Sequence, residues 1–230
     1  EKARKIQNIL ISTYQADIAK HSGKQNSMHI ARIWENIPNQ LAQSLDGSAK
    51  KFKVKNIVSG NANYSRLASS IDWLHTANLI IKVLIINKAE FPFLAYSKEN
   101  TFKLYIFDVG LLGALSNLDP GIIWNYSYGS YKGFFAENFV AQEFLAQNSK
   151  KLFCWKENTS EVEFLQEKNG KILPVEVKSG WVTQSKSLKV FAEKYNPIYR
   201  TIMSAKNLYI DNKNKIHNYP LYLAGQFPLE

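Results

Sequence analysis

The first third of the chain repeats apolar residues every three or four positions, the spacing of one buried face of an α-helix. This pattern predicts helices over residues 1–20, 28–45 and 64–78. Pro38 lies inside the second helix and predicts a kink or an interruption there, because proline has no backbone N–H to donate. Asn63 directly precedes the third helix, where its side chain can accept a hydrogen bond from a free N–H of the first turn.

Two apolar runs follow, at residues 79–86 and 101–110, and both are typical of strands. Helices followed by a β-ribbon are the order of a winged helix, in which the third helix and the wing usually face DNA. Arg66 on the third helix is then a candidate DNA contact. The alternative is a packing module that only joins other domains. Arg66, His75 and Lys82 are too few cations to decide between the two.

The second half of the chain mixes helical and strand patterns, which indicates an α/β (α+β) fold with a mixed sheet flanked by helices. Helices are expected over 134–148 and 185–195, strands over 151–157, 161–167, 171–179 and 199–207, and a further extended pair near the C-terminus. Residues 113–130 are rich in Gly, Pro, Asn and Ser and predict a connecting loop. The expected domains are therefore a helical, winged-helix-like region at 1–112 and a second domain at 131–230.

The stretch EVEFLQEKNGKILPVEVKSG, residues 161–180, reads as a β-hairpin, because Asn-Gly is the strongest short signal for a type I′ turn. With that turn, Glu163 lies opposite Glu176, and Glu161 lies opposite Lys178. Strand side chains alternate between faces, so this register predicts all four side chains on one face. Pro174 is a position where a bulge would change the register.

Glutamates directly opposite one another destabilise a sheet unless something neutralises them. On an exposed face, water and Lys178 are sufficient. A divalent metal is the alternative, since Mg²⁺ or Mn²⁺ takes carboxylate oxygens together with water and phosphate oxygens. Glu163 and Glu176 would hold that metal, which would polarise a phosphodiester and lower the pKa of a coordinated water. Lys178 would orient this water or offset developing negative charge.

An acid, a hairpin turn and then acid-x-lysine resemble the motif of the PD-(D/E)xK nuclease superfamily, whose preceding helix often adds a third carboxylate. Glu137 in FFAENFVAQEF is the candidate third metal ligand, and Glu143 is a weaker one. A solvent-facing glutamate is the other interpretation of Glu137. The candidate catalytic residues are therefore Glu163, Glu176 and Lys178.

Four stretches in order, FKLYIFDVGLLGAL, GFFAENFVAQEF, EVEFLQEKNGKILPVEVKSG and KSLKVFAEKY, resemble the C-terminal domain of unknown function that follows the ATPase domain in many prokaryotic AAA+ proteins. STYQADIAK, IWENIPNQL and IDWLHTANLI resemble the middle region of the same family. The resemblance implies a restriction-endonuclease-like C-terminal fold, and a P-loop ATPase before Glu1. The family usually has aspartate where this chain has Glu163, and the longer side chain can loosen an octahedral metal site.

ATP binding is expected only in a full-length protein, because SGKQ at 22–25 lacks the upstream glycine and strand of a phosphate-binding loop. The net charge of +10 lies mostly in residues 1–112 and suits a polyanion, or serves ordinary solubility. Lys51 and Lys53 alternate with apolar residues as in an amphipathic edge strand, which would contact nucleic acid or discourage aggregation. By analogy with such nucleases, Lys186 and Lys189 would lie near a bound phosphate.

The single cysteine, Cys154, excludes an internal disulfide, fits a reducing cytoplasm and is expected to be a buried core residue. The longest apolar run is too short to span a bilayer, so no membrane partner is expected. The expected partners are nucleic acid, an N-terminal ATPase domain of the same protein and, from the AAA+ resemblance, further copies of the chain. The functional hypothesis is a Mg²⁺- or Mn²⁺-dependent nuclease. A catalytically inactive nuclease fold that binds nucleic acid or protein is the alternative.

Overall fold

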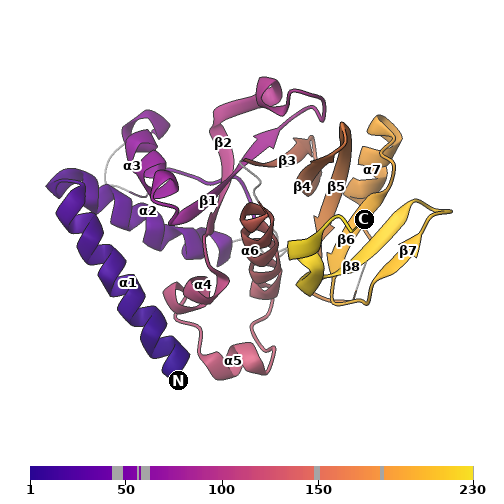
Figure 1. Cartoon of the computed structure of the whole chain (residues 1–230). Coiled ribbons are helices and arrows are strands. Elements are labelled where there is room, and N and C mark those ends of the chain that lie inside the picture. The colour runs from indigo at the N-terminus through magenta and orange to yellow at the C-terminus, as the bar shows by residue number, and fades with distance from the viewer. Residues whose placement is uncertain (43–48, 56, 58–62, 148–150, 182–183, 230) are drawn as a thin grey trace. The chain divides into compact units, whose positions relative to one another are not determined.

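The computed structural model describes residues 1–230 except residues 43–48, 56, 58–62, 148–150, 182–183 and 230 (Figure 1). The chain divides into two compact units that are interleaved in sequence. The helical unit contains residues 1–81 and 104–138, and the sheet unit contains residues 82–103 and 139–230. The contiguous domains expected from the sequence stay a prediction, because a compact unit is not by itself a domain that folds alone.

The helical unit packs its helices against one another, α1 on α2 and α4, and α2 on α3 and α4. Its helices are α1 (Lys2–His21), α2 (Lys24–Ala42), α3 (Tyr64–Thr76), α4 (Val109–Leu115), α5 (Pro120–Trp124) and the start of α6 (Tyr131–Ala146). Trp34 of α2 is fully buried, and its indole N–H donates to the carbonyl of Leu79 at 3.3 Å. The three predicted N-terminal helices are therefore confirmed, with shifted ends.

The helix ends follow local chemistry. The side chain of Asn63 accepts from the N–H of Arg66 at 3.1 Å, which confirms the predicted cap of α3. α2 runs through Pro38 without a break, so an interruption there is wrong. The connecting segment contains the end of α4 and the whole of α5, which the loop prediction missed. Asp108 and Asp119 cap these two helices. Asp119 directly precedes Pro120, and an aspartate followed by proline is a signal in the sequence for the start of a helix.

The apolar stripe of α1 and the basic run at 50–55 both differ in the structure from what the sequence predicts. Ile6 and Ile9 on the apolar stripe of α1 are 59% and 65% exposed, whereas Ile18 is buried. The basic run at 50–55 forms no strand. Instead, the Gln40 side chain donates to the Lys53 carbonyl at 2.6 Å and accepts from the Lys53 N–H at 2.8 Å. The side-chain amide of Gln40 therefore pairs with the backbone of Lys53, as a neighbouring strand would in a sheet.

One eight-stranded mixed sheet is formed by strands between residues 80 and 220, in the order β2-β1-β3-β4-β5-β6-β8-β7. Its strands are β1 (Ile80–Ile86), β2 (Ser97–Ile106), β3 (Leu152–Glu157), β4 (Ser160–Lys168), β5 (Lys171–Val177), β6 (Arg200–Ser204), β7 (Tyr209–Asp211) and β8 (Ile216–Pro220). β1–β3, β5–β6 and β6–β8 are parallel, whereas β3–β4, β4–β5 and β7–β8 are antiparallel. The predicted mixed α/β architecture is confirmed.

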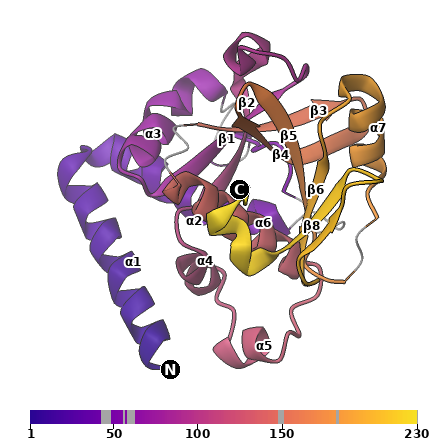
Figure 2. The same cartoon turned by 45° about the vertical axis from the view of Figure 1, so that its right-hand side comes forward.

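The winged-helix interpretation is not confirmed, because β1 lies inside the sheet and pairs in parallel with β3. The remaining helices of the sheet unit are α7 (Lys186–Tyr195) and two 3₁₀ helices, η1 (Phe93–Tyr96) and η2 (Leu221–Gln226). α7 packs on β4 and β5, and η2 lies beside β8 (Figures 1 and 2).

Under α7, a cluster of buried apolar residues forms the core of the sheet unit. Trp155 of β3 meets Phe191 of α7 edge to face, with ring centroids 5.2 Å apart. Leu188 belongs to the same cluster, and the Ser185 hydroxyl accepts from its N–H at 3.1 Å as the cap of α7. The sequence predicts this helix correctly, because its apolar stripe and its cap agree.

No helix in the described ranges is both long enough and apolar enough to cross a bilayer. This agrees with the short apolar runs of the sequence.

Replacing Gly170 with alanine is expected to lower the free energy of unfolding by about 1–2 kcal/mol, measured by urea denaturation. Gly170 has a φ of +72°, and no atom lies within 4 Å of an added Cβ, so the cost is purely conformational. Gly180→Ala is the matched control, because Gly180 also has open space but no positive φ. Equal stability of Gly170→Ala and Gly180→Ala would contradict the turn conformation.

Candidate active site

The β4–β5 hairpin has the turn and the register that the sequence predicts. Asn169 and Gly170 have φ values of 52° and 72°, as a type I′ turn requires. From the turn, the strands pair without a shift as far as Phe164 opposite Val175. Pro174 introduces no bulge into this pairing. The predicted register is therefore confirmed over the whole paired stretch.

A β-bulge in β4 changes the faces that its side chains take. Between two paired positions β3 has one residue, Cys154, whereas β4 has two, Glu163 and Phe164. Strict alternation would place Val162 and Leu165 on opposite faces. Both nevertheless belong to the buried cluster under α7. The extra residue of the bulge reverses the alternation at this point.

The bulge makes the prediction that Glu161 shares one face with Glu176 wrong, because Glu161 follows the alternation of its neighbour Val162. Glu176 pairs in register with Ile202 of β6, and Ile202 belongs to the cluster under α7. Paired residues of neighbouring strands point to the same face, so Glu176 lies on the face of Val162. The predicted alternation placed those two side chains on opposite faces. The error has a physical cause, since an extra residue moves everything beyond it to the other face.

Glu163 reaches β5 through its carboxylate, just beyond the last regular pair of the hairpin. The N–H of Lys178 donates to the Met203 carbonyl in β6 at 2.8 Å, so the N–H of Val177 points the other way, to β4. Oε2 of Glu163 accepts this N–H at 3.4 Å. Glu163 is 6% exposed. The backbone N–H of Val177, the residue after Glu176, therefore positions the Glu163 carboxylate.

Glu176 carries a partly satisfied buried carboxylate. Its Oε1 forms an ion pair with Nζ of Lys178 at 2.6 Å, and the two side chains are 5% and 34% exposed. Its Oε2 is buried and has no hydrogen-bond partner among the described residues. Leaving such an oxygen without a donor or a cation costs about 1–3 kcal/mol. Lys178 connects the buried carboxylate to the solvent, and Oε2 can take a further ligand.

Glu161 belongs to a different ion-pair cluster. Its two oxygens lie 2.5 Å from Nζ of Lys103 and of Lys156, and the Lys103 side chain is fully buried. Burial by itself would raise the pKa of Glu161, but the attraction of Lys103 and Lys156 lowers it below its ordinary value. Lys103 was missed in the sequence, although a lysine inside the apolar run FKLYIF signals a buried partner.

Glu137 forms hydrogen bonds within the helical unit. Its oxygens accept from the N–H of Ala49 at 3.1 and 3.2 Å, and Oε2 accepts from the Tyr105 hydroxyl at 2.8 Å. Asn138 is also buried, and its amide binds both the N–H and the carbonyl of Ile106, at 2.9 and 2.8 Å. These bonds join α6 to the end of β2. A metal-binding role for Glu137 stays a prediction.

The described ranges contain no group of three or more His, Cys, Asp or Glu side chains that could hold a metal ion. The His and Cys residues thus offer no alternative centre there. Glu163 and Glu176 stay the two predicted metal ligands, and their carboxylates are hard oxygens of the kind that Mg²⁺ accepts when waters or phosphates complete its shell. The buried Oε2 of Glu176 without a hydrogen-bond partner fits such a ligand.

The five predicted nucleic-acid contacts are exposed in the structure. Lys51 and Lys53 lie on the irregular segment after α2, and Arg66 lies on the first turn of α3, all in the helical unit. Lys186 and Lys189 lie on α7 in the sheet unit. Their role in binding stays a prediction.

Two family models match the chain. Residues 1–121 match a domain of unknown function, DUF8612, and residues 132–222 match a second domain of unknown function, DUF4143. No curated protein and no solved structure matches the chain.

Proposed function

We propose a function for this chain, which belongs to the DUF8612 family by the match of that family's model to residues 1–121. In this proposal, the chain is a nuclease-like module that acts on the phosphodiester bonds of nucleic acid. Glu163 and Glu176 would hold Mg²⁺ or Mn²⁺, and Lys178 would act beside them. The finer fold assignment, a restriction-endonuclease-like sheet, belongs to the same proposal. It also includes a AAA+ ATPase domain as the partner of the DUF4143 segment, with ATP bound there.

The buried carboxylate of Glu176 is the observation that supports this proposal most strongly. A hairpin that needed only stability would not bury an oxygen without a donor, because that costs free energy. Here Oε2 of Glu176 is buried with no donor among the described residues, next to the strand position that Glu163 contacts. Such local costs are typical of functional sites, where a ligand supplies the missing interaction.

The residues of the hairpin have distinct tasks in this proposal. Glu163 and Glu176 supply negatively charged oxygens, and the backbone N–H of Val177 orients the first of them. A bound divalent ion would polarise the phosphodiester and lower the pKa of a coordinated water. Lys178 is partly exposed, so its ammonium can swing from Glu176 towards a phosphate oxygen and offset its charge.

A non-catalytic module is the second candidate, and one observation favours it. The acids of the hairpin already have lysine partners, since Glu176 pairs with Lys178 and Glu161 pairs with Lys103 and Lys156. Lysines can therefore neutralise much of this negative charge without a metal. In this case the fold would serve to bind nucleic acid or a protein partner.

Titration calorimetry with Mn²⁺ tests the metal site directly. Glu176→Gln removes the charge but keeps the shape, and we expect Mn²⁺ binding to weaken at least about tenfold, because carboxylates are preferred ligands of such ions. Glu167→Gln is the matched control, since Glu167 is an exposed glutamate of the same hairpin. Unchanged Mn²⁺ affinity in Glu176→Gln would exclude the assigned ligand.

Cleavage of labelled single- and double-stranded DNA and RNA tests the activity. We expect Mn²⁺-dependent cleavage that falls at least about a hundredfold in Lys178→Ala, the usual size of a lost catalytic group. Lys171→Ala, at an exposed lysine that begins the strand preceding Lys178, should cleave like the wild type. Cleavage by Lys178→Ala at the wild-type rate would contradict the catalytic role assigned to Lys178. No cleavage by wild-type protein that binds Mn²⁺ would favour the non-catalytic module.

A further inference from the structure

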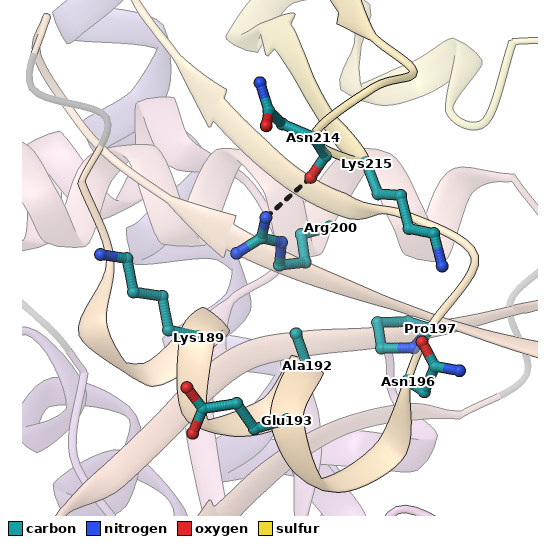
Figure 3. A pocket seen from close by; sticks show the side chains of 8 residues that line it. All are labelled: Lys189, Ala192, Glu193, Asn196, Pro197, Arg200, Asn214 and Lys215. Atoms are coloured by element: carbon teal, nitrogen blue, oxygen red, sulfur yellow. Dashed lines mark hydrogen bonds between the residues drawn. The ribbon is translucent and has the colours of Figure 1, made fainter.

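A cleft of about 400 Å³ opens in the sheet unit, between α7, the start of β6 and the connection between β7 and β8 (Figure 3). Three cations line it from these three segments: Lys189, Arg200 and Lys215. Figure 3 shows the guanidinium of Arg200 between the other two, with Lys189 on one side and Lys215 on the other. None of the three lies in the hairpin of the candidate active site.

Arg200 is held in place by a hydrogen bond but has no counter-ion among the residues that the structure describes. It is half-buried, and its Nη2 donates to the carbonyl of Asn214 at 2.8 Å, the dashed line in Figure 3. No carboxylate forms an ion pair with Arg200 among the described residues. A guanidinium has five N–H donors in a planar fork, so most of its donors remain available to a ligand.

The charge of the cleft is positive. Lys189, Arg200 and Lys215 contribute three positive charges, and Glu193 is the one acid in the lining, which leaves a net of +2. Neither Lys189 nor Lys215 forms an ion pair in the described part of the chain. Exposed lysines usually need no partner, but an oriented arginine between two of them favours an anion that spans several donors.

The cleft and the candidate active site share one face of the sheet. Arg200 comes two residues before Ile202 on β6, and Ile202 pairs in register with Glu176. A second hollow, of about 140 Å³, is also lined by Lys189 and Arg200 and extends to Ile202. From strand spacing and rise, the Cα atoms of Arg200 and Glu176 lie roughly 8 Å apart. Along one strand of a B-form duplex, at about 3.4 Å of helix axis per nucleotide, this distance corresponds to about two to three nucleotides.

We propose that this cleft binds the phosphate backbone of a nucleic-acid strand whose scissile bond lies at Glu176, a proposal that rests on the proposed function. Arg200 contacts a phosphate through its fork, and Lys189 and Lys215 attract the neighbouring phosphates. Phosphate fits the cleft better than a single carboxylate, because phosphates repeat along the strand and match cations on three separate segments.

Fluorescence anisotropy with a short fluorescein-labelled DNA single strand, in EDTA, tests binding without cleavage. Arg200→Gln should weaken binding about tenfold, the usual loss of one charge-assisted contact. Lys189→Gln combined with Lys215→Gln should lower the slope of log affinity against log salt by about 1.4, or 0.7 for each phosphate. Lys213→Gln, at an exposed lysine of the same connection outside the cleft, should bind like the wild type. A strand with an uncharged methylphosphonate backbone should not bind.

Two results would contradict the proposal that this cleft binds a nucleic-acid strand. One is a loss in Lys213→Gln as large as in Arg200→Gln, because binding would then follow overall charge. The other is unchanged affinity in the Lys189/Lys215 double variant. That variant changes only exposed side chains, so its fold is retained and the test stays decisive even if Arg200→Gln is unstable. Glu176→Gln separates the two proposals. If Glu176→Gln stops cleavage but still binds the strand in EDTA, both proposals are supported. If the wild type binds the strand but does not cleave it, strand binding in the cleft is supported and the proposed nuclease activity is contradicted.

Discussion

Replacing Glu161 with alanine is expected to lower the free energy of unfolding by about 3–5 kcal/mol, the usual cost of removing one partner from a buried ion pair. Lys103 is fully buried, and Glu161 lies 2.5 Å from its Nζ. Without that carboxylate, the ammonium of Lys103 stays in a poorly solvated place with less compensation. Equilibrium denaturation in urea, followed by circular dichroism, measures the change.

The control is an exposed pair on the same sheet unit. Glu157 and Lys194 lie 2.6 Å apart, but their side chains are 34% and 45% exposed. Glu157→Ala should therefore cost at most about 1 kcal/mol. Adding Lys103→Met to Glu161→Ala should recover most of the loss, since no buried charge remains. A loss in Glu161→Ala no greater than in Glu157→Ala would contradict the buried pair.

The same pair has a defined pH dependence. The pKa of Glu161 in the folded protein is below its ordinary value of 4.5. Its contribution to stability is therefore complete above about pH 4.5 and is lost as the pH falls through the folded-state pKa. The difference in stability between wild type and Glu161→Ala should accordingly shrink below pH 4.5.

The thiol of Cys154 is expected to react with iodoacetamide at least about a thousandfold more slowly in the folded protein than in guanidinium at the same pH. Cys154 is fully buried, and burial raises its pKa to about 12. At about pH 8, roughly one thiol in 10⁴ is then ionised, and only the thiolate attacks. Mass spectrometry of the alkylated chain follows the reaction, and Cys154 is the only cysteine that reacts.

A thiol on the surface provides the comparison. Lys213→Cys in a Cys154→Ser background places the only cysteine at an exposed position, and it should react at nearly the unfolded rate. The raised pKa also predicts that the Cys154 contribution to stability is complete below the unfolded-state pKa of about 9 and is lost between about pH 9 and 12. Rapid alkylation of Cys154 in the folded wild type would be inconsistent with this core position.

Local signals account for most elements that the sequence predicts correctly. The apolar stripe and the Asn63 cap lead to α3, and the stripe and the Ser185 cap lead to α7. Asn-Gly fixes the hairpin turn and the register that follows from it. Each of these features depends on residues close in sequence, so periodicity and turn chemistry are sufficient to find them.

The site itself was predictable only in part. The sequence identifies Glu163, Glu176 and Lys178 as a group, and the structure places them around the end of the hairpin. The alternation rule fails at the bulge, because that extra residue depends on pairing with β3, a strand that the hairpin pattern does not include. Lys103 and Arg200 come to their sites from distant strands, and no local pattern predicts such partners.

The amino-acid sequence by itself determined most helices and strands and the hairpin register, because these follow from neighbours along the chain, but it did not reveal α4 and α5. Only the tertiary structure decided that β1 joins the sheet beside β3, that Glu176 shares a sheet face with Ile202, and that Glu161 pairs with Lys103 and Lys156 rather than with Lys178. These outcomes depend on which strands pair across long separations, and that choice is made by the burial of the whole sheet.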